Sequence, residues 1–247
     1  MSRKVWEGQD AVVARPSYHQ GRQGADHSAD IQSAGSVFDG AQACAWARNL
    51  LPMKRQEQPM EYLHGFGSSF DPLSTKIQTL KSLGDVTGSD YDYSEPFNRV
   101  LDSMIRSVSQ RQPDLLVGTS LGGFYAAALS SRLGIPFVAI NPSIDPRRSL
   151  ARYEGQGTSW TGAAYHLTRA VIDGYPEYSL DANHGLILLD RGDEICDAEM
   201  TEQFLGPYYQ IISYAGGHHR FAHMEDSLAA IKLFARNAGT TINKETE

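Results

Sequence analysis

Short apolar stretches alternate along this chain with segments whose apolar residues recur at helical spacing. The apolar stretches, each of a length that suits a buried strand, fall at residues 60–64, 84–89, 114–118, 136–141, 185–190 and 208–214. Helical patterns are predicted over residues 73–83, 96–111, 122–133 and 222–237. This alternation predicts an α/β fold with a mostly parallel sheet of about six strands, flanked by helices on both faces.

Two segments lie outside the regular alternation. Residues 1–58 precede the first predicted strand, and we expect an N-terminal extension there, with an Ala-rich helix over 29–51. The sequence leaves its role open between covering a sheet edge, extending a lid, binding a partner protein and forming a homo-oligomer. Residues 146–183 interrupt the alternation between two predicted strands. We therefore expect one core domain over residues 59–240, with a small insertion that folds as a lid or as a helical crossover.

The composition is that of an ordinary globular domain. Hydrophobic residues make up 41% and charged residues 21% of the 247 positions. A net charge of −7 argues against a general nucleic-acid-binding protein. No apolar run approaches the ~18 residues of a membrane span, and the N-terminus has a basic start without the apolar core of a signal peptide. We therefore expect a cytoplasmic protein.

The most informative motif is G-T-S-L-G at residues 118–122. It joins a predicted strand to an Ala-rich predicted helix, which is the setting in which a G-x-S-x-G turn holds a nucleophilic serine. The turn forces the serine into a strained backbone conformation, and the flanking glycines keep the neighbouring chains from clashing. Ser120 is therefore the candidate nucleophile, at a helix N-terminus whose dipole favours negative charge.

An acid and a histidine follow in the chain order that such a serine requires. Asp190 ends a predicted strand, and Asp193 lies in the turn directly after it. The position in the turn favours Asp193 over Asp190 as the acid that orients the base. After the last predicted strand, the run G-G-H-H-R-F offers His218 and His219 as candidate general bases, with His223 close behind them.

The run His64-Gly65-Phe66 follows the first predicted strand. A turn of this kind commonly directs a backbone N–H towards the nucleophile. We assign the expected oxyanion hole to the N–H groups of Phe66 and Leu121. His64 is expected to brace this loop or, with Gly65, to contact the substrate, because the late histidines fit the role of base better.

Several blocks of the sequence occur together in a fixed order. They are Y-L-H-G-F-x-S-S from Tyr62, the G-x-S-L-G-G elbow from Gly118, N-P-S from Asn141, G-D-E from Gly192 and G-G-x-H-x-F from Gly216. These blocks resemble those of the YqiA/YcfP-like (UPF0227) esterases, over roughly residues 60–236. The resemblance implies an α/β-hydrolase fold, hydrolysis of an ester or thioester, and a triad of Ser120, Asp193 and His219. The family usually has an acid at the position of His218, so His218 and His223 stay open as alternative bases.

The insertion carries aromatic residues, among them Tyr153 and Trp160, which suit either the lining of an acyl pocket or the core face of a crossover. We expect these two side chains to contact the substrate. The chain has only two cysteines, Cys44 and Cys196, and no H-E-x-x-H pattern. Neither a catalytic metal nor another cofactor is therefore expected.

Together, these observations predict a serine hydrolase that cleaves a small-molecule carboxylic ester or thioester through an acyl-enzyme. An acyltransferase that uses the same three residues is the alternative among enzymes. The non-enzymatic alternative is a ligand- or protein-binding module on a hydrolase scaffold.

Overall fold

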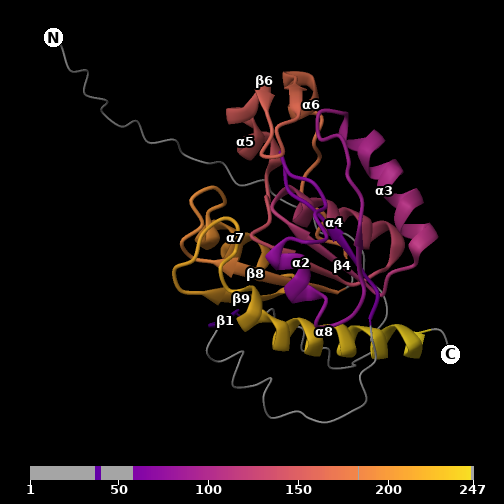
Figure 1. The fold of residues 1–247 in the computed structure, drawn as a ribbon. Helices are drawn as coiled ribbons and strands as arrows, with labels where there is room; N and C mark the ends of the chain where they lie inside the picture. The colour runs from indigo at the N-terminus through magenta and orange to yellow at the C-terminus, as the bar shows by residue number, and fades with distance from the viewer. Residues whose placement is uncertain (1–36, 40–57, 183, 246–247) are drawn as a thin grey trace, which may run out of the picture. The chain divides into compact units, whose positions relative to one another are not determined.

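The computed structural model describes residues 37–39, 58–182 and 184–245, all of which belong to one compact unit, Ala34–Glu247 (Figure 1). A fully parallel, seven-stranded sheet forms its centre, with the strand order β1-β9-β8-β5-β4-β2-β3. The strands are β1 (Val37–Asp39), β2 (Met60–Leu63), β3 (Val86–Gly88), β4 (Leu115–Thr119), β5 (Phe137–Ile140), β8 (Gly185–Asp190) and β9 (Gln210–Tyr214). All but β1 coincide with the predicted apolar stretches, which confirms the parallel α/β architecture.

β1 is the strand of this seven-stranded sheet that the sequence pattern did not predict. It pairs in parallel with β9, with Val37 opposite Ile211 and Asp39 opposite Ser213. The expected helix over 29–51 is therefore wrong at residues 37–39, and the rest of that range lies outside the described residues. β-branched and aromatic residues favour strands, and the open edge of β9 supplies a partner. The sheet thus includes a strand from the segment that we expected to be an extension.

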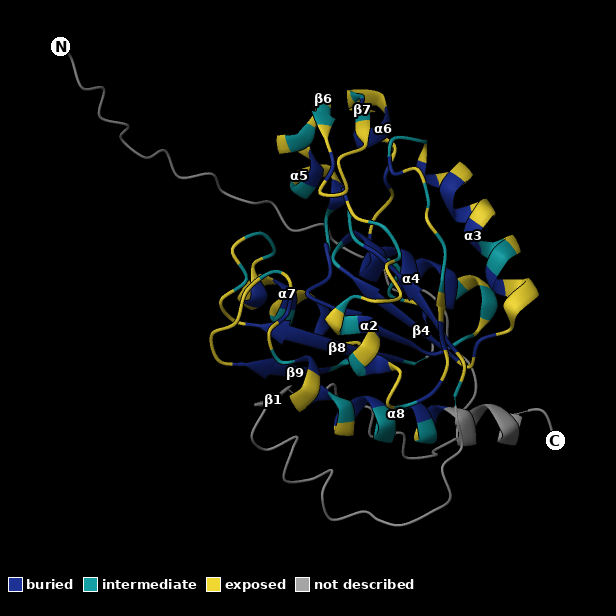
Figure 2. Ribbon diagram, viewed as in Figure 1, coloured by how far each residue is buried: buried dark blue, intermediate teal, exposed yellow. Residues whose placement is uncertain are grey.

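Alternate residues of the strands build two hydrophobic layers, one on each face of the sheet. On one face, Leu116 and Ala139 pack with α3 (Phe97–Arg111) and α4 (Leu121–Leu133). On the other face, Leu115 and Val117 pack with α2 (Thr75–Leu80) and α8 (Met224–Glu245). Figure 2 shows the strands as a buried layer between partly exposed helices. These are the predicted helices, although α2 is shorter than expected and α8 runs further.

The insertion between β5 and β8 combines short helices with a two-stranded hairpin. Its elements are α5 (Pro146–Leu150), η1 (Ala151–Tyr153), β6 (Gly155–Thr158), β7 (Ala164–Leu167) and α6 (Arg169–Asp173). β6 and β7 pair antiparallel and form a sheet of their own, at the top of the view in Figure 1. Further along, Tyr175 and Tyr178 are buried in the same hydrophobic layer as α3 and α4. The insertion therefore contributes both to a projecting hairpin and to the core.

The carboxyl ends of the parallel strands lie at one edge of the sheet, which is where open α/β sheets bind ligands. The candidate residues follow β2, β4, β8 and β9 at this edge. Between β8 and β9 the chain forms α7 (Ala198–Leu205), a helix that the sequence pattern did not predict; the Asp197 side chain caps it by accepting a hydrogen bond from the Met200 N–H. Among the described helices, none is long and apolar enough to cross a membrane.

Candidate active site

Ser120 occupies a sharp turn between β4 and α4. Its backbone has φ 56° and ψ −120°, a strained conformation for a residue with a side chain. The turn needs its two glycines, because an added Cβ at Gly118 would lie 2.1 Å from the Gly122 carbonyl oxygen and one at Gly122 would lie 2.0 Å from the Leu63 oxygen. The close approach of three backbone segments therefore holds the Ser120 side chain at the edge of the sheet, as the motif predicts.

The imidazole ring of His219 lies between Ser120 and Asp193. Its Nε2 is 3.0 Å from the Ser120 Oγ, and its Nδ1 is 2.8 Å from Asp193 Oδ2 and 3.0 Å from Oδ1. Because a carboxylate only accepts hydrogen bonds, the proton sits on Nδ1 and leaves Nε2 to accept from the serine hydroxyl. The structure thus brings together the three residues that the sequence analysis placed in separate loops.

Backbone N–H groups of its own turn hold the Asp193 carboxylate. Oδ1 accepts from the Ile195 N–H at 2.7 Å and from the Cys196 N–H at 2.8 Å. The side chain is only 1% exposed, and that of His219 is 15% exposed. The acid is therefore fixed and shielded from water, whereas the ring that it orients remains accessible.

The alternative acid and bases lie elsewhere. Asp190 is fully buried and pairs with His223, whose Nδ1 lies 2.6 Å from Asp190 Oδ1. His218 is exposed, and its backbone N–H, rather than its ring, contacts Asp190. Within the described part of the chain, neither His218 nor His223 forms a hydrogen bond with Ser120.

The loop after β2 lies beside the nucleophile. A Cβ at Gly65 would lie 3.3 Å from the Ser120 Cβ, so the loop backbone passes next to the serine. Phe66 follows in a turn, and Leu121 is the first residue of α4, where the initial N–H groups of a helix have no partner within the helix. Both N–H groups chosen for the oxyanion hole therefore lie on the backbone that flanks Ser120.

His64 braces this loop from inside. It is 1% exposed, its Nδ1 lies 2.8 Å from the Gly65 oxygen, and its ring stacks on Tyr91 with centroids 4.2 Å apart. Burial lowers the pKa of His64, against smaller raising effects from the Gly65 backbone and Asp90. Sequence reasoning missed Tyr91, whose hydroxyl also donates to the His64 oxygen at 2.6 Å. The sequence feature that could have identified Tyr91 is an aromatic residue in the loop directly after the predicted strand at 84–89.

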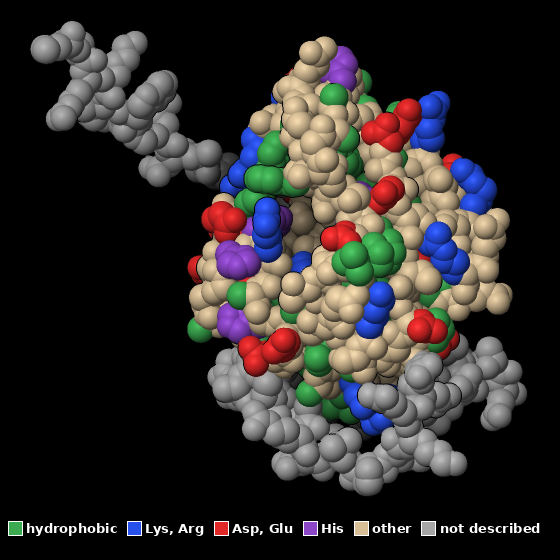
Figure 3. Space-filling view, in the orientation of Figure 1, with side chains coloured by type: hydrophobic (Ala, Val, Ile, Leu, Met, Phe, Trp, Pro, Cys, Tyr) green, Lys and Arg blue, Asp and Glu red, His purple; other side chains and the backbone are tan. Residues whose placement is uncertain are grey.

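An aromatic cluster joins the loop after β2, residues 64–69, to the insertion. The Phe66 ring contacts Tyr93, Tyr153 and Tyr165, with centroids 4.5, 4.8 and 5.2 Å away. The backbone N–H of Trp160 donates to the Gly67 carbonyl oxygen at 2.9 Å. Figure 3 shows a hollow in the surface between the insertion and the body of the sheet, with basic and histidine side chains beside it.

The Trp160 side chain contacts the loop that carries His219. Trp160 is 76% exposed, and its ring lies under the Arg220 guanidinium, 5.4 Å from the centroid. Tyr153 thus lies beside the loop after β2, and Trp160 lies beside both that loop and the histidine loop. Both residues were expected near the substrate. Whether they touch a substrate stays a prediction.

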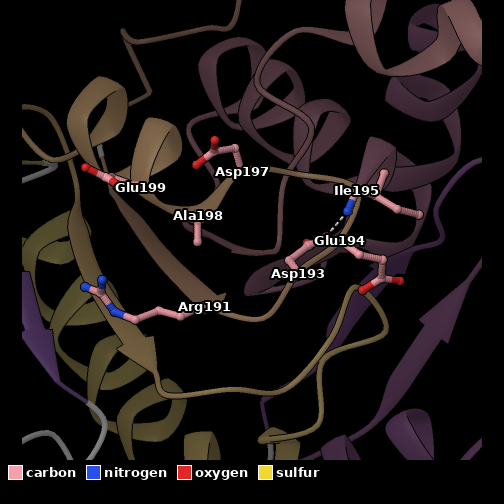
Figure 4. Close-up of a pocket in the computed structure, with 7 residues that line it drawn as sticks. All are labelled: Arg191, Asp193, Glu194, Ile195, Asp197, Ala198 and Glu199. Carbon is pink, nitrogen blue, oxygen red and sulfur yellow. Dashed lines mark hydrogen bonds between the residues drawn. The ribbon is translucent and has the colours of Figure 1, made fainter. Parts of the chain in front are cut away.

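Two pockets adjoin the turn that holds Asp193. The larger, of about 460 Å³, is lined by Arg191, Asp193, Glu194, Ile195, Asp197, Ala198 and Glu199 (Figure 4). A smaller one of about 160 Å³ lies between α5 and α7 and includes Cys196 in its wall. Neither is lined by Ser120 or His219. For this reason neither pocket is the natural place for an acyl group attached to the serine. The larger pocket is also lined mostly by charged residues, which do not suit an apolar acyl group.

Asp193, Cys196 and His219 also lie close enough to be considered as metal ligands, with one ligand atom of each within 4.8 Å of the others. Burial, and secondarily the Asp193 carboxylate, raise the pKa of the Cys196 thiol well above its usual range. A thiol binds a metal ion as the thiolate. The contact that the structure shows within this cluster is the hydrogen bond from His219 Nδ1 to Asp193, which orients the histidine ring.

Comparison with known proteins places this chain in a family. The family described as "Uncharacterised protein family (UPF0227)" matches residues 60–236. A UPF0227 protein of Yersinia pseudotuberculosis is 29% identical over 179 residues, which span 70% of this chain and 96% of the relative. A UPF0227 protein of Yersinia pestis matches to the same extent.

Solved structures share the fold at low sequence identity. Est1E from Butyrivibrio proteoclasticus is 16% identical, with a TM-score of 0.61 over 76% of this chain and 90% of that one. A monoacylglycerol lipase from Paleococcus ferrophilus is 15% identical, with a TM-score of 0.54 over 73% of this chain and 94% of that one. The parallel sheet, the serine turn after β4 and these likenesses establish the α/β-hydrolase fold. The chain belongs to the UPF0227 family.

Proposed function

We propose that this protein is a serine hydrolase that cleaves carboxylic esters or thioesters through an acyl-enzyme. The observation that carries the proposal is the position of the His219 ring, hydrogen-bonded to Ser120 through Nε2 and to Asp193 through Nδ1. A base that both touches the nucleophile and is oriented by a carboxylate is the arrangement that activates a serine hydroxyl.

In this mechanism Ser120 Oγ attacks the carbonyl carbon of the substrate while His219 Nε2 takes its proton. Asp193 keeps the ring in the tautomer that accepts this proton and stabilises the imidazolium that forms. The imidazolium then protonates the departing alcohol or thiol, which leaves an acyl group on Ser120. A water molecule, deprotonated by His219, hydrolyses this acyl-enzyme and restores the serine.

The negative oxygen of the tetrahedral intermediate would lie against the N–H groups of Phe66 and Leu121. Leu121 opens a helix of 13 residues, so the positive end of the helix dipole adds to its N–H. Removal of one such donor typically costs about 3–4 kcal/mol of activation free energy. The aromatic cluster of Phe66, Tyr93, Tyr153 and Tyr165 is well placed to hold the loop that presents the first donor.

The names of the structural neighbours agree with this proposal. They include a monoacylglycerol lipase and an esterase domain from Rhodothermus marinus, which is 19% identical with a TM-score of 0.52. Ferulic acid is bound in one structure of Est1E. At these identities the neighbours share the fold with this chain, so the proposed activity depends on the arrangement of Ser120, Asp193 and His219.

Hydrolysis of p-nitrophenyl esters over a series of acyl lengths, by the wild type and by Ser120→Ala, tests the proposal. We expect turnover by the wild type and a fall in kcat of roughly 10³-fold or more in the variant. A fluorophosphonate probe should label the wild type at Ser120 and leave Ser120→Ala unlabelled. A folded wild-type protein that neither hydrolyses any ester nor reacts with the probe would favour a binding module instead.

A further inference from the structure

The loop that carries His219, residues 215–223, is held by side chains from the ends of two strands. Asn141 follows β5, and its Nδ2 donates to the carbonyl oxygens of His218 at 3.1 Å and His219 at 3.2 Å. Asp190 ends β8, and its Oδ2 accepts from the N–H groups of His218 at 3.1 Å and Ala222 at 2.6 Å. These contacts fix the backbone on both sides of the His219 ring.

The Asn141 side chain also binds the backbone of Asp190. Asn141 Oδ1 accepts from the Asp190 N–H at 2.8 Å. Asn141 has a φ of 43°, an uncommon conformation for a residue other than glycine, and such strain is often found at functional sites. Gly217 has a φ of 74°, and an added Cβ there would lie 2.0 Å from Asp190 Oδ2. The loop is thus pressed directly against the carboxylate.

His223 completes this arrangement. Its Nδ1 lies 2.6 Å from the second carboxylate oxygen of Asp190, Oδ1, and its ring stacks on Tyr214 with centroids 4.9 Å apart and planes at 10°. Since the carboxylate only accepts, His223 carries its proton on Nδ1. Asp190 is 0% exposed and the His223 side chain 25%, so His223 lies between the buried carboxylate and the surface.

Other charged groups face this pair. Lys76 on α2 interacts electrostatically with Asp190, and Arg220 from the histidine loop interacts with Lys76. On the other side of the loop, Glu194 Oε2 accepts from the His219 N–H at 3.1 Å. Among these groups His223 is the one that hydrogen-bonds to Asp190 Oδ1, so its N–H fixes the direction in which the carboxylate points.

We propose that His223 and Asp190 form a second histidine–carboxylate pair, which positions His219 for its role as base. The inference rests on the proposed function. His223 and Asp190 are positioning residues, because they act through the loop backbone and touch neither Ser120 nor the substrate carbonyl. Their pairing orients the Asp190 carboxylate, the carboxylate fixes the N–H groups of the loop, and the loop sets the distance from Nε2 to Ser120.

A purely structural role is the competing explanation, because His223 directly precedes α8 and its carbonyl oxygen accepts from the Ser227 N–H at 3.0 Å. Two nearly isosteric variants separate the explanations. In His223→Asn the amide nitrogen takes nearly the place of Nδ1 and keeps a donor for Asp190. In His223→Leu the volume is similar but the donor is gone. His218→Gln changes an exposed histidine of the same loop and is the matched control.

We expect His223→Leu to lower kcat roughly tenfold to a hundredfold with KM changed by less than about twofold, the effect of a misplaced catalytic group. His223→Asn should recover most of kcat, and His218→Gln should match the wild type. In ¹H NMR spectra, the far-downfield resonance of the His219 Nδ1 proton should persist in His223→Asn and broaden or disappear in His223→Leu. Wild-type kcat in His223→Leu, or an equal loss in His223→Asn and His223→Leu, would overturn the proposal.

The two measurements also separate this proposal from the proposed function. If the wild type hydrolyses no ester, the function fails, but the His219 resonance still reports whether His223 orders the ring. An unchanged resonance in a folded His223→Leu would then reject the positioning role. If His223→Leu does not fold, Asp190→Asn replaces it, because one amide cannot accept from the loop and from His223 as the carboxylate does; wild-type kcat in that variant would equally reject the role.

Discussion

Lys76 reaches from α2 to Thr119 and donates a hydrogen bond to its hydroxyl over 3.1 Å, one residue before Ser120. The Tyr62 hydroxyl is hydrogen-bonded to the same Thr119 oxygen, at 3.0 Å. Burial lowers the pKa of Lys76 from 10.5 to about 8, with Asp190 opposing the shift and Arg220 adding to it. An ammonium group therefore lies in a poorly hydrated place, close to the proposed nucleophile.

Lys76→Met should stabilise the protein at pH 7. Below pH 8 the lysine is charged in both the folded and the unfolded state, and its burial opposes folding. As pH rises from about 8 towards 10.5, the folded protein releases this proton before the unfolded chain does, so the destabilisation fades. We expect the free energy of unfolding to increase by about 1–2 kcal/mol at pH 7, after loss of the Thr119 hydrogen bond, and by less at pH 9.5. Urea denaturation of both proteins at the two pH values measures this, and an equal gain at both would contradict it.

Gly122→Ala should be severely destabilising. Its Cβ would lie 2.0 Å from the Leu63 carbonyl oxygen, between two backbone segments that cannot separate without opening the sheet. We expect a loss of at least about 3–4 kcal/mol in the free energy of unfolding. Gly134→Ala is the control, because Gly134 has a φ of 70° and no atom within 4 Å of an added Cβ. Its free energy of unfolding should fall by only about 1–2 kcal/mol, because an alanine in the left-handed conformation is strained. Thermal or urea unfolding ranks the two, and the reverse order would refute the explanation.

Arg111 pairs with Glu61, a carboxylate in β2 that is only 1% exposed and also accepts from the Thr87 hydroxyl at 2.8 Å. Arg111→Met would leave this buried charge without its cation, so we expect a loss of about 2 kcal/mol, moderated because Arg111 is 35% exposed. Arg106→Met changes an exposed arginine of the same helix that forms no ion pair within the described residues, and it should cost less than about 0.5 kcal/mol. Similar urea midpoints for the two variants would show that the pair contributes little.

Cys196 should react slowly with iodoacetamide in the folded protein. Its thiol pKa is raised chiefly by burial, so the thiol stays protonated between pH 7 and about 9, where an exposed cysteine becomes a thiolate. Labelling in native buffer should be about a hundredfold or more slower than in urea, and its rate should rise little with pH over this range. Site-resolved mass spectrometry separates Cys196 from Cys44. Equal labelling rates with and without urea would disprove the burial of the thiol.

The sequence predicted those features that depend on local pattern. Apolar stretches separated by helical segments predicted six of the seven strands of the central sheet, from β2 to β9. The glycines around Ser120 predicted the turn that holds it. The hairpin of β6 and β7 escaped prediction because it has no continuous buried face: its first strand, Gly155–Thr158, alternates partly exposed with exposed residues. β1 was not predicted because a stretch of three residues forms a strand only when a neighbouring edge, here that of β9, is available for pairing.

The choice between Asp190 and Asp193 marks the limit of sequence reasoning at the site. Both follow the same apolar stretch, and spacing along the chain does not separate them. In the structure Asp190 still belongs to β8 and pairs with His223, whereas Asp193 has entered the turn, where two N–H groups aim it at His219. The direction of each side chain depends on where the strand ends, and the sequence pattern locates that end only approximately.

The proposed triad draws one residue from the end of each of β4, β8 and β9, and 99 positions separate Ser120 from His219. None of the three is within reach of another in an extended chain, so the site has no partial form made from neighbouring residues. Contacts between such distant positions form late and slowly in folding. A nascent or truncated chain that ends before β9 would hold the serine and the acid but no base. Under the proposed function, the onset of ester turnover during refolding would therefore time the docking of the last central strand.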